Sequence, residues 1–516
     1  MPPQVPRMIP PKTAGYQSES PVPNLVANLA GTGWSSILGI ALVPVYVRVL
    51  GIESYGLIGL FAAMVGILQA FDFGLTPTMH REMARYSTSL PGEGEVRSFV
   101  RTLEVCYGSV GLALGVGIMV LGPGAAGRWI KSAALPVDTV EKALALMGLV
   151  IIFQWPLSLY IGGLQGLHRQ VRLNAVRILL ATAGAVGIMI ILLRVSPTIG
   201  AFFTWQALVS AVQLLALRAL LWHELPQGGS RPRVSVSLIR GVGGFALGMS
   251  GITVSGLILA NLDKVILSRL LPLSGFGYYS LAVTIATGLG LMIVVPIYNV
   301  FFPRFAALIA AGEFTRLRKD YHLGAQVMAV LVVPTAAVIA LFSRDLVLIW
   351  TGSLEAALNV APVLSVMIMG TALNGLMFIP YALQLAHGWT ALALRLSFVF
   401  VLLAVPSIIV MSTRFGARGA ALVWAVQNLI YVIAGVPLTH RRVLVGEARE
   451  WLIKDFAYPL CAVLVVAVGL RLAWFQPLSP AASALRMAVT LAASACAAAL
   501  AASKVRQFAF RLLSGR

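Results

Sequence analysis

Charged residues are scarce in this chain. Only 11% of its 516 residues are Asp, Glu, Lys or Arg, whereas 59% are hydrophobic and the mean hydropathy is +0.89. A soluble domain cannot bury that much apolar surface, so the composition excludes a soluble globular protein and indicates an integral membrane protein. The apolar stretches are about 20 residues long and do not alternate with polar residues, which favours membrane-spanning helices over barrel strands.

Cysteines and metal-ligand spacings are scarce too. The three cysteines, Cys106, Cys461 and Cys496, lie far apart within apolar stretches, which excludes a disulfide framework. The six histidines are spread over separate loops, so we predict no metal site and no cofactor. The net charge of +20 comes from basic residues scattered through short loops. That distribution favours a positive-inside topology with anionic membrane lipids nearby, and we expect no nucleic-acid partner.

Long loops are also missing. No loop between the apolar stretches is long enough to fold as a catalytic domain outside the membrane. This argues against a membrane glycosyltransferase or polymerase, and we expect that the protein is not an enzyme.

The apolar stretches predict fourteen spans, and basic residues concentrate in the tails and the even-numbered loops. This bias places both termini in the cytosol of a multi-pass protein. Residues 1–23 are predicted to be a disordered cytosolic tail, and residues 504–516 a basic cytosolic tail. The predicted spans are 24–48, 55–77, 102–122, 143–164, 173–193, 198–221, 239–261, 276–302, 323–342, 358–384, 390–411, 417–439, 453–472 and 482–502.

The sequence contains an internal repeat at an offset of 219 to 221 residues. Short motifs recur in the same order: the segment beginning at Arg48 matches the one beginning at Arg269, Leu164-Gln165 matches Leu383-Gln384, and Gly200-Ala201 matches Gly419-Ala420. Six spans separate the copies, and an even number keeps the same orientation, so the halves are predicted to be parallel and related by an axis along the membrane normal. Carriers built in this way place their site between the halves.

The expected fold is therefore an all-α membrane protein of about 14 transmembrane helices. It comprises two parallel six-helix lobes related by a pseudo-two-fold axis, plus two extra C-terminal helices. The predicted boundaries are 24–222 for the N-lobe, 223–238 for a cytosolic linker, 239–440 for the C-lobe and 451–503 for spans 13 and 14.

Several motifs resemble one known group of transporters. They are Arg48-Val-Leu-Gly-Ile-Glu-Ser-Tyr-Gly, Phe71-Asp72-Phe73-Gly74-Leu75, Arg81-Glu82-Met-Ala-Arg85-Tyr, Gly277-Tyr-Tyr-Ser, Phe302-Pro303-Arg304 and Gly416-Ala-Arg-Gly-Ala. In order and spacing they resemble the polysaccharide transporter (Wzx-like) branch of the multidrug/oligosaccharidyl-lipid/polysaccharide (MOP) flippase superfamily.

The resemblance implies an inner-membrane flippase. Such a protein moves undecaprenyl-diphosphate-linked oligosaccharide units from the cytosolic to the periplasmic leaflet by alternating access, for O-antigen lipopolysaccharide or exopolysaccharide synthesis. The lipid-linked oligosaccharide and membrane lipids are then the expected partners, together with a polysaccharide polymerase and chain-length proteins. The interior of the first span carries no cation before Arg48, which disfavours the peptidoglycan precursor as substrate.

A diphosphate needs cations along its path, because hydrocarbon does not tolerate its charge. The alternative for each cation below is an interfacial residue that anchors a helix end. Arg177 and Arg395 are further candidates near the cytosolic starts of spans 5 and 11. The main candidates are Arg48 and Arg269 at repeat-related positions, Lys264, Arg81 and Arg85 on a predicted amphipathic helix, and Arg304.

Two acidic residues are candidates for ion coupling. Asp72 and Asp263 lie at the ends of the second and seventh spans, where either could bind a proton or a sodium ion. Alternatively, Asp72 caps a helix and Asp263 forms an interfacial pair with Lys264. For the sugars, the candidates are the aromatic residues Trp34 and Tyr298 and the amides Asn28, Gln69 and Asn299; these amides could instead bond neighbouring helices.

A second reading of the same features is a MATE-like, cation-coupled exporter of small molecules or drugs from the same superfamily. That function needs a compact acidic pocket, which only Asp72 and Asp263 could provide.

Overall fold

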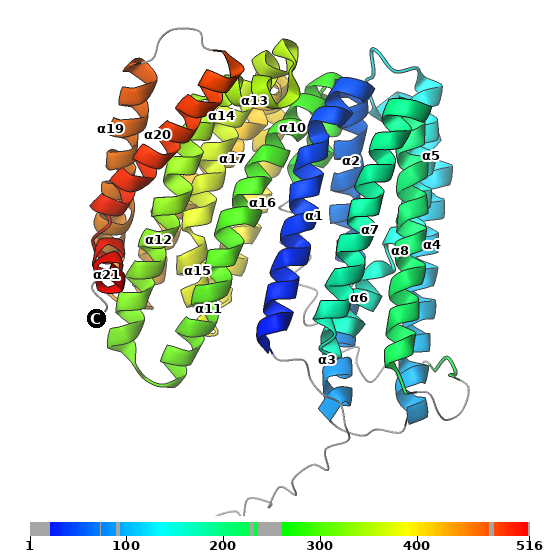
Figure 1. The fold of residues 1–516 in the computed structure, drawn as a ribbon, viewed down its shortest axis with the longest axis horizontal. Helices are drawn as coiled ribbons and strands as arrows, with labels where there is room; N and C mark the ends of the chain where they lie inside the picture. The colour runs from blue at the N-terminus through cyan, green and yellow to red at the C-terminus, as the bar shows by residue number, and fades with distance from the viewer. Residues whose placement is uncertain are drawn as a thin grey trace, which may run out of the picture. The chain divides into compact units, whose positions relative to one another are not determined.

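Helices make up all of the regular structure in the described part of the chain (Figure 1). A computed structural model of the protein describes residues 21–72, 74–88, 93–226, 232–235, 261–473 and 479–513. Within these residues, twelve helices are long and apolar enough to cross a membrane, and α2 (Ile52–Leu68) is a shorter apolar helix. The predicted span 239–261, apart from residue 261, and residues 1–20 of the predicted tail 1–23 lie outside the described residues. The predicted all-α membrane fold with about fourteen helices is confirmed.

The chain divides into two compact units. Unit 1 contains residues 1–38, 68–124 and 141–254, and unit 2 contains residues 39–67, 125–140 and 255–516. Unit 2 therefore consists of the second half of the chain together with three parts of the first half. These parts are the end of the first helix, nearly all of α2 and residues 125–140.

Unit 1 is built from helices of the first half of the chain. Its first helix, α1, continues into unit 2. The helices and turns are α1 (Pro21–Leu50), η1 (Gln69–Asp72), α3 (Leu75–Thr88), α4 (Glu93–Trp129), α5 (Val137–Gln154), α6 (Leu157–Gly166), α7 (Gln170–Ile190), η2 (Ile191–Val195) and α8 (Ile199–Glu224).

The predicted span 55–77 is interrupted in the structure. The apolar helix α2 ends at Leu68, and a 3-10 turn and Gly74, with φ of 72°, lead into the separate helix α3. A positive φ costs glycine little, which explains why the chain can turn at this residue. Met79 and Met83 of α3 are fully buried, so α3 packs into the core of unit 1 and does not lie alone on a membrane surface.

Glycines of α6 permit this close packing. A Cβ built at Gly166 would lie 2.4 Å from the carbonyl oxygen of His80, and one at Gly162 would lie 3.0 Å from that of Thr76. Backbone oxygens cannot move aside as a flexible side chain can, so larger residues at these positions would push α3 away from α6.

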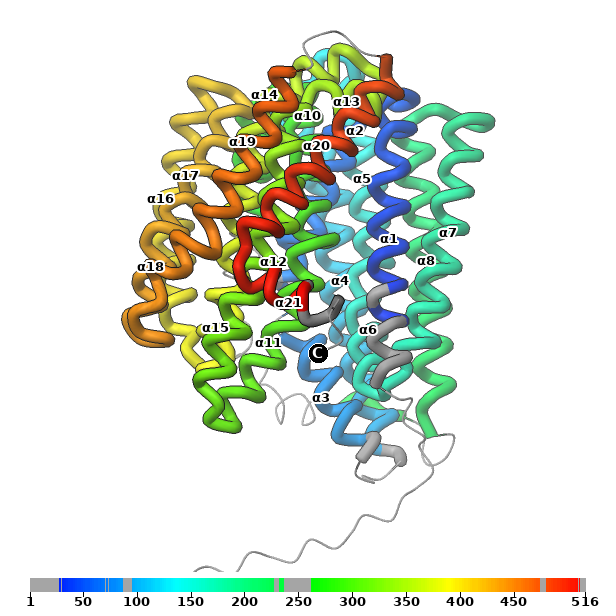
Figure 2. Tube along the Cα trace, turned by 60° about the vertical axis from the view of Figure 1, so that its left-hand side comes forward, coloured from blue at the N-terminus to red at the C-terminus, as the bar shows by residue number. Residues whose placement is uncertain are grey.

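Unit 2 consists mainly of helices from the second half of the chain. In Figure 2, α19 and α20 run side by side and α21 follows the end of α20. Residues 261–270 are helical as well. The remaining elements are α10 (Leu273–Leu289), η3 (Gly290–Val294), α11 (Val295–Ala310), α12 (Phe314–Leu341), α13 (Ser343–Thr351), α14 (Leu354–Leu376), α15 (Phe378–Ala386), α16 (Ala391–Phe415), α17 (Ala417–His440), α18 (Ala448–Glu450), η4 (Trp451–Ala457), α19 (Tyr458–Ala473), α20 (Pro480–Ala501) and α21 (Ser503–Leu513).

Side chains and glycines define where several helices begin and end. The hydroxyls of Thr198, Ser353 and Ser479 each accept a hydrogen bond from the backbone N–H three residues later, at the starts of α8, α14 and α20. These caps satisfy N–H groups that have no partner within the helix. Gly352, with φ of 67°, ends α13 in the left-handed conformation that glycine adopts most readily.

The sequence repeat has a counterpart in the helix boundaries. The starts of α2 and α10 (52 and 273), of α6 and α15 (157 and 378) and of α7 and α16 (170 and 391) are each 221 residues apart. A left-handed residue lies two positions after the last residue of both α6 and α15: His168 in one copy and Gly388 in the other. The two halves therefore share one order of helices, although the second passes through the π-helical turn η3 where the first is broken at η1.

Candidate functional site

Unit 2 contains a cavity of about 200 Å³ among its membrane-spanning helices. Its walls come from residues 262–264 and from α10, α14, α16 and α17. Most of the lining is apolar. The polar lining residues are Asp263, Lys264, Tyr279, Thr287, Thr371, Trp424 and Gln427. Two of the sequence candidates, Asp263 and Lys264, thus lie together in one cavity.

The carboxylate of Asp263 has two partners. The hydroxyl of Tyr279 donates to Oδ2 at 2.5 Å, and the ammonium of Lys264 lies 3.3 Å from Oδ1. The side chains of Asp263 and Lys264 are 22% and 19% exposed, so the pair is well shielded from water without being sealed. One negative and one positive charge leave this pair neutral.

The repeat-related arginines contact equivalent places in the opposite halves. The Arg48 Nε donates to the carbonyl oxygen of Thr351, the last residue of α13. The Arg269 guanidinium lies over the ring of Trp129, the last residue of α4, at 5.2 Å from its centroid. Residues 48 and 269 are 221 apart and residues 129 and 351 are 222 apart, so the two contacts correspond under the repeat to within one residue. A cation at a helix C-terminus and a cation over an indole are both favourable.

Helices α2 and α10 cross closely beside these arginines. A Cβ at Gly56 would lie 2.8 Å from the carbonyl oxygen of Leu273, and one at Gly277 would lie 2.3 Å from that of Ile52. Gly56 and Gly277 are 221 residues apart, and so are Ile52 and Leu273. The repeat therefore relates these two contacts as well. Near the middle of the crossing, a Cβ at Gly59 would lie 2.7 Å from the Cβ of Ser280. Within unit 2, the first and second halves of the chain therefore meet through backbone contact that only glycine allows.

Because of these contacts, we expect substitutions of Arg48 and Arg269 to reduce transport. Replacing either by Ala is expected to lower transport several-fold, on the basis of about 1 kcal/mol for one such contact. Lys is expected to retain more transport, because an ammonium still carries the charge. Complementation of a deletion strain at matched protein level measures this, with Arg344→Ala, an exposed residue of α13, as the control. Wild-type transport in both Ala variants would contradict the expectation.

Asp72 lies in unit 1 and caps a helix. Its carboxylate accepts hydrogen bonds from the backbone N–H of Thr76 at 3.2 Å, from the Thr76 hydroxyl at 2.6 Å and from the hydroxyl of Tyr107. The bonds to Thr76 hold the first turn of α3, which is the capping geometry considered for this residue from the sequence.

Asn28 and Trp34 of α1 both bond to α7 within unit 1. The Asn174 Nδ2 donates to the side-chain oxygen of Asn28 at 2.6 Å, and the indole N–H of Trp34 donates to the hydroxyl of Thr182 at 2.9 Å. Gly31 lies between them, where a Cβ would clash with Asn174. These polar groups thus connect two neighbouring helices.

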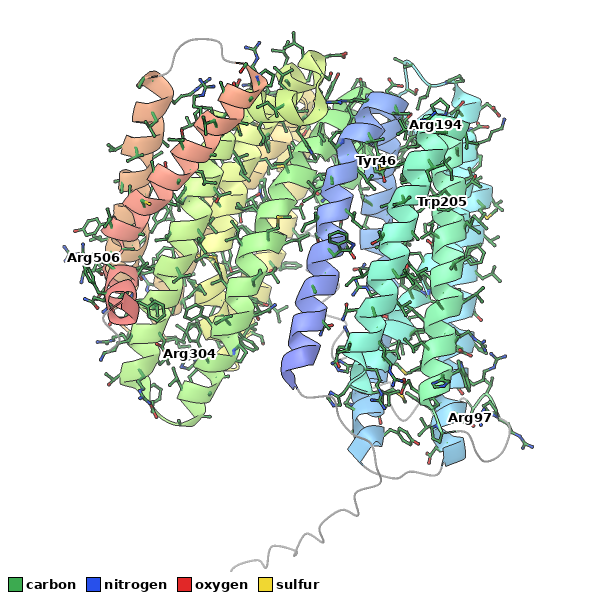
Figure 3. All side chains as sticks on the ribbon, in the orientation of Figure 1. Tyr46, Arg97, Arg194, Trp205, Arg304 and Arg506 are labelled. Atoms are coloured by element: carbon green, nitrogen blue, oxygen red, sulfur yellow. The ribbon has the colours of Figure 1, made fainter. Side chains whose placement is uncertain are left out.

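Three of the other predicted cations form ion pairs. Arg81 and Arg85 both contact Glu82, at 2.6 and 3.3 Å, and Arg304 contacts Asp320 at 2.6 Å. Figure 3 places Arg304 near one end of unit 2. Pairs this exposed contribute little stability, so their charges remain available to a ligand.

The remaining sequence candidates lie on or beside α11 and η1. The ring of Tyr298 stacks on Phe302 at 5.5 Å and meets Phe378 edge-on at 5.9 Å. Asn299 and Gln69 are exposed. Tyr298 therefore belongs to an aromatic cluster between α11 and α15, while the two amides face away from the packed interior.

Sequence reasoning missed part of the cavity. Tyr279 was one of many span aromatics, and Thr371, Trp424 and Gln427 had no distinguishing signal. Only the repeated Gly-Ala-x-x-x-Trp motif pointed toward these residues, because Trp424 is the last residue of its second copy. The indole N–H of Trp424 donates to the hydroxyl of Thr371 at 3.2 Å. Arg177, a lesser sequence candidate, is half-buried on α7, and no hydrogen bond or ion pair engages it within the described residues.

Solved structures share this fold. The protein is similar to the lipid II flippase MurJ in an inward closed conformation, with a TM-score of 0.71 and 12% identity, over 93% of this chain and 98% of that one. It is also similar to an inward-facing MATE multidrug resistance transporter of the MOP superfamily, with a TM-score of 0.63 and 14% identity, over 84% of this chain and 99% of that one. The fold is that of the MOP-superfamily transporters.

Sequence comparison identifies the family. A family model described as polysaccharide biosynthesis protein matches residues 22–309. That match spans more than half of the 516 residues, and the chain belongs to this family. A Shigella flexneri protein whose name describes it as an O-antigen transporter is 20% identical over 409 residues, which are 79% of this chain and 95% of that protein. The protein is thus a multi-pass membrane protein of a polysaccharide biosynthesis family.

Proposed function

We propose that this protein is an inner-membrane flippase for undecaprenyl-diphosphate-linked oligosaccharide units, which it moves from the cytosolic to the periplasmic leaflet. The observation that carries the proposal is membership of the polysaccharide biosynthesis family over residues 22–309. The transporter fold and the O-antigen transporter relative support it. We further propose that both termini are cytosolic and that a polymerase and chain-length proteins act on the product.

Uncompensated cations would bind the diphosphate. Arg48 bonds a carbonyl oxygen and Arg269 lies on an indole ring, so neither charge is neutralised by a carboxylate among the described contacts. Arg177 adds a half-buried guanidinium on α7. Guanidinium groups donate paired hydrogen bonds that match phosphate oxygens. The paired cations Arg81, Arg85, Arg304 and Lys264 are proposed as secondary contacts along the path.

Asp263 would couple an ion to transport. It is the only carboxylate among the described residues that line the cavity, and Tyr279 and Lys264 hold it in place. Binding of a proton or sodium ion there would release Lys264, and the helices around the cavity would respond to the changed charge. Substrate and ion would then drive turnover by binding inward- and outward-open states with different affinity.

Deletion of the gene tests the function in cells. We expect complete lipid-linked oligosaccharide units to accumulate on the cytosolic leaflet and surface polysaccharide to be lost, with both restored by the wild-type gene. Normal surface polysaccharide without accumulation would contradict the proposal. A deletion strain with normal polysaccharide but increased sensitivity to cationic drugs would instead indicate the MATE-like exporter.

The cavity itself argues against that exporter. A cationic drug needs excess negative charge, whereas Lys264 already neutralises Asp263 in the cavity. The flippase is the better fit.

A further inference from the structure

A second polar cluster lies in unit 2, separate from the cavity. It joins α12, the segment between α17 and α18, and the π-helical turn η4. His322 of α12 is 2% exposed, and its Nδ1 lies 2.5 Å from Oδ2 of Asp455 while its Nε2 lies 3.1 Å from Oε2 of Glu447. One oxygen of Glu450, one of Glu447 and a ring nitrogen of His322 all lie within 4.8 Å of one another.

The ring of His322 cannot satisfy both acids by itself. A neutral imidazole donates from one nitrogen only, and an ionised carboxylate only accepts. If Nδ1–H donates to Asp455, the Nε2 lone pair faces a carboxylate oxygen of Glu447, and the two repel. This geometry therefore requires a cation between His322 and the glutamates, either a proton or a metal ion.

The surroundings of His322 are those of a metal-binding histidine. Such histidines usually donate their other ring N–H to a carboxylate, which fixes the tautomer and ring orientation. Asp455 occupies that position, and the Gln326 Nε2 in turn donates to its other oxygen at 2.8 Å. Asp455 is 2% exposed and Gln326 is 1% exposed, so this outer support is rigidly packed.

The two glutamates have partners that can be displaced. Arg318 contacts Oε1 of Glu447 at 2.8 Å, and Lys454 contacts Oε1 of Glu450 at 3.1 Å. The cationic side chains are 58% and 53% exposed, and ion pairs with such exposed partners contribute little stability. Because Arg318 contacts Oε1 of Glu447, the other oxygen, Oε2, still points toward His322.

Two further polar atoms nearby lack partners among the described residues. They are Nε2 of His440 and the hydroxyl of Tyr321, on side chains that are 2% and 0% exposed. The Tyr321 ring contacts both histidine rings, at 5.3 Å from His322 and 5.4 Å from His440. His440 Nδ1 lies 2.8 Å from the carbonyl oxygen of Val436, to which it donates, so Nε2 carries a free lone pair. His440 also interacts electrostatically with His322 and Glu447.

We propose that His322, Glu447 and Glu450 bind a divalent transition metal ion of the zinc class, with Asp455 orienting His322. One imidazole and two carboxylates suit such an ion better than Ca²⁺ or Mg²⁺, which prefer oxygen ligands alone. The metal joins α12 to the segment before α18 and thereby fixes α19 and α20 to the rest of unit 2.

Zinc binding to the full-length protein tests this site. The purified protein, free of affinity tag and treated with a chelator, is titrated with Zn²⁺ by calorimetry, and Co²⁺ is followed by its visible absorption. We expect one Zn²⁺ per chain, a Co²⁺ spectrum typical of nitrogen and oxygen ligands, and a metal-dependent rise in melting temperature. Asp455→Asn should weaken binding about 10- to 100-fold, and His322→Ala should abolish it.

Controls separate the site from other sources of binding. His387→Ala removes a histidine whose Nδ1 contacts only its own helix among the described residues, and should bind Zn²⁺ as the wild type does. If His322→Ala fails to fold, Glu450→Gln replaces it, because Glu450 is only partly buried. Absence of Zn²⁺ binding by the wild type, or equal binding by the wild type and the folded site variants, would overturn the proposal and leave a proton as the bridging cation.

Discussion

A disulfide between cysteines placed at Gly59 and Ser280 is expected to stop transport until it is reduced. A Cβ built on Gly59 lies 2.7 Å from the Cβ of Ser280, which is about 1 Å closer than the roughly 3.8 Å usual between the Cβ atoms of a disulfide. A small separation of α2 and α10 therefore allows the bond. Alternating access requires helices of the two sequence halves to part during each cycle, and this bond would prevent it.

The experiment uses a protein in which Cys106, Cys461 and Cys496 are replaced by Ala. The control pair is Ser343→Cys with Ser365→Cys, whose hydroxyl oxygens lie 2.8 Å apart on α13 and α14 of the same half. The control disulfide should form without loss of transport. Full transport through the oxidised Gly59/Ser280 variant would show that α2 and α10 do not separate, and alternating access at this crossing would be wrong.

Asp263→Asn is expected to reduce transport at least about 10-fold, beyond the effect of any instability. The substitution leaves Lys264 without its carboxylate and removes the group proposed to bind the coupling ion. For a partly shielded pair the loss of stability is on the order of 2 kcal/mol.

A variant that lacks both charges separates the loss of transport from the loss of stability. Asp263→Asn with Lys264→Met should restore the melting temperature, because no unpaired charge remains, but should not restore transport. Glu313→Gln, at an exposed acid paired with Arg316, serves as the control. Transport at the wild-type level in the double variant would exclude Asp263 as the coupling residue.

Much of the fold could be predicted from the sequence because hydrophobic spans of fixed length are a strong signal. The repeat was equally informative, since its offset recurs in the helix starts and, to within one residue, in the contacts of Arg48 and Arg269. The predicted span 55–77 ran through the break between α2 and α3, although a helix cap at Asp72 was one of the two interpretations of that residue. The apolar run alone does not reveal that the chain turns at Gly74 and that a new helix begins after Asp72.

The sites were harder to predict, since they depend on residues far apart in the chain. Asp263 and Lys264 were chosen as rare charges near a span end, but Tyr279 and Trp424 become part of the cavity only through helix packing. The His322 cluster joins residues more than 120 positions apart. No local metal-ligand spacing could reveal it, and the sequence prediction of no metal site followed from that spacing alone.

The most direct measurement of the central claim is flipping by the purified protein. Proteoliposomes are loaded with undecaprenyl-diphosphate-linked oligosaccharide in both leaflets, and an added enzyme modifies only the sugars exposed outside. We predict that active protein lets the enzyme reach nearly all of the lipid, whereas the oxidised Gly59/Ser280 disulfide variant limits it to about half, the share of one leaflet. Equal access with and without active protein would contradict the account.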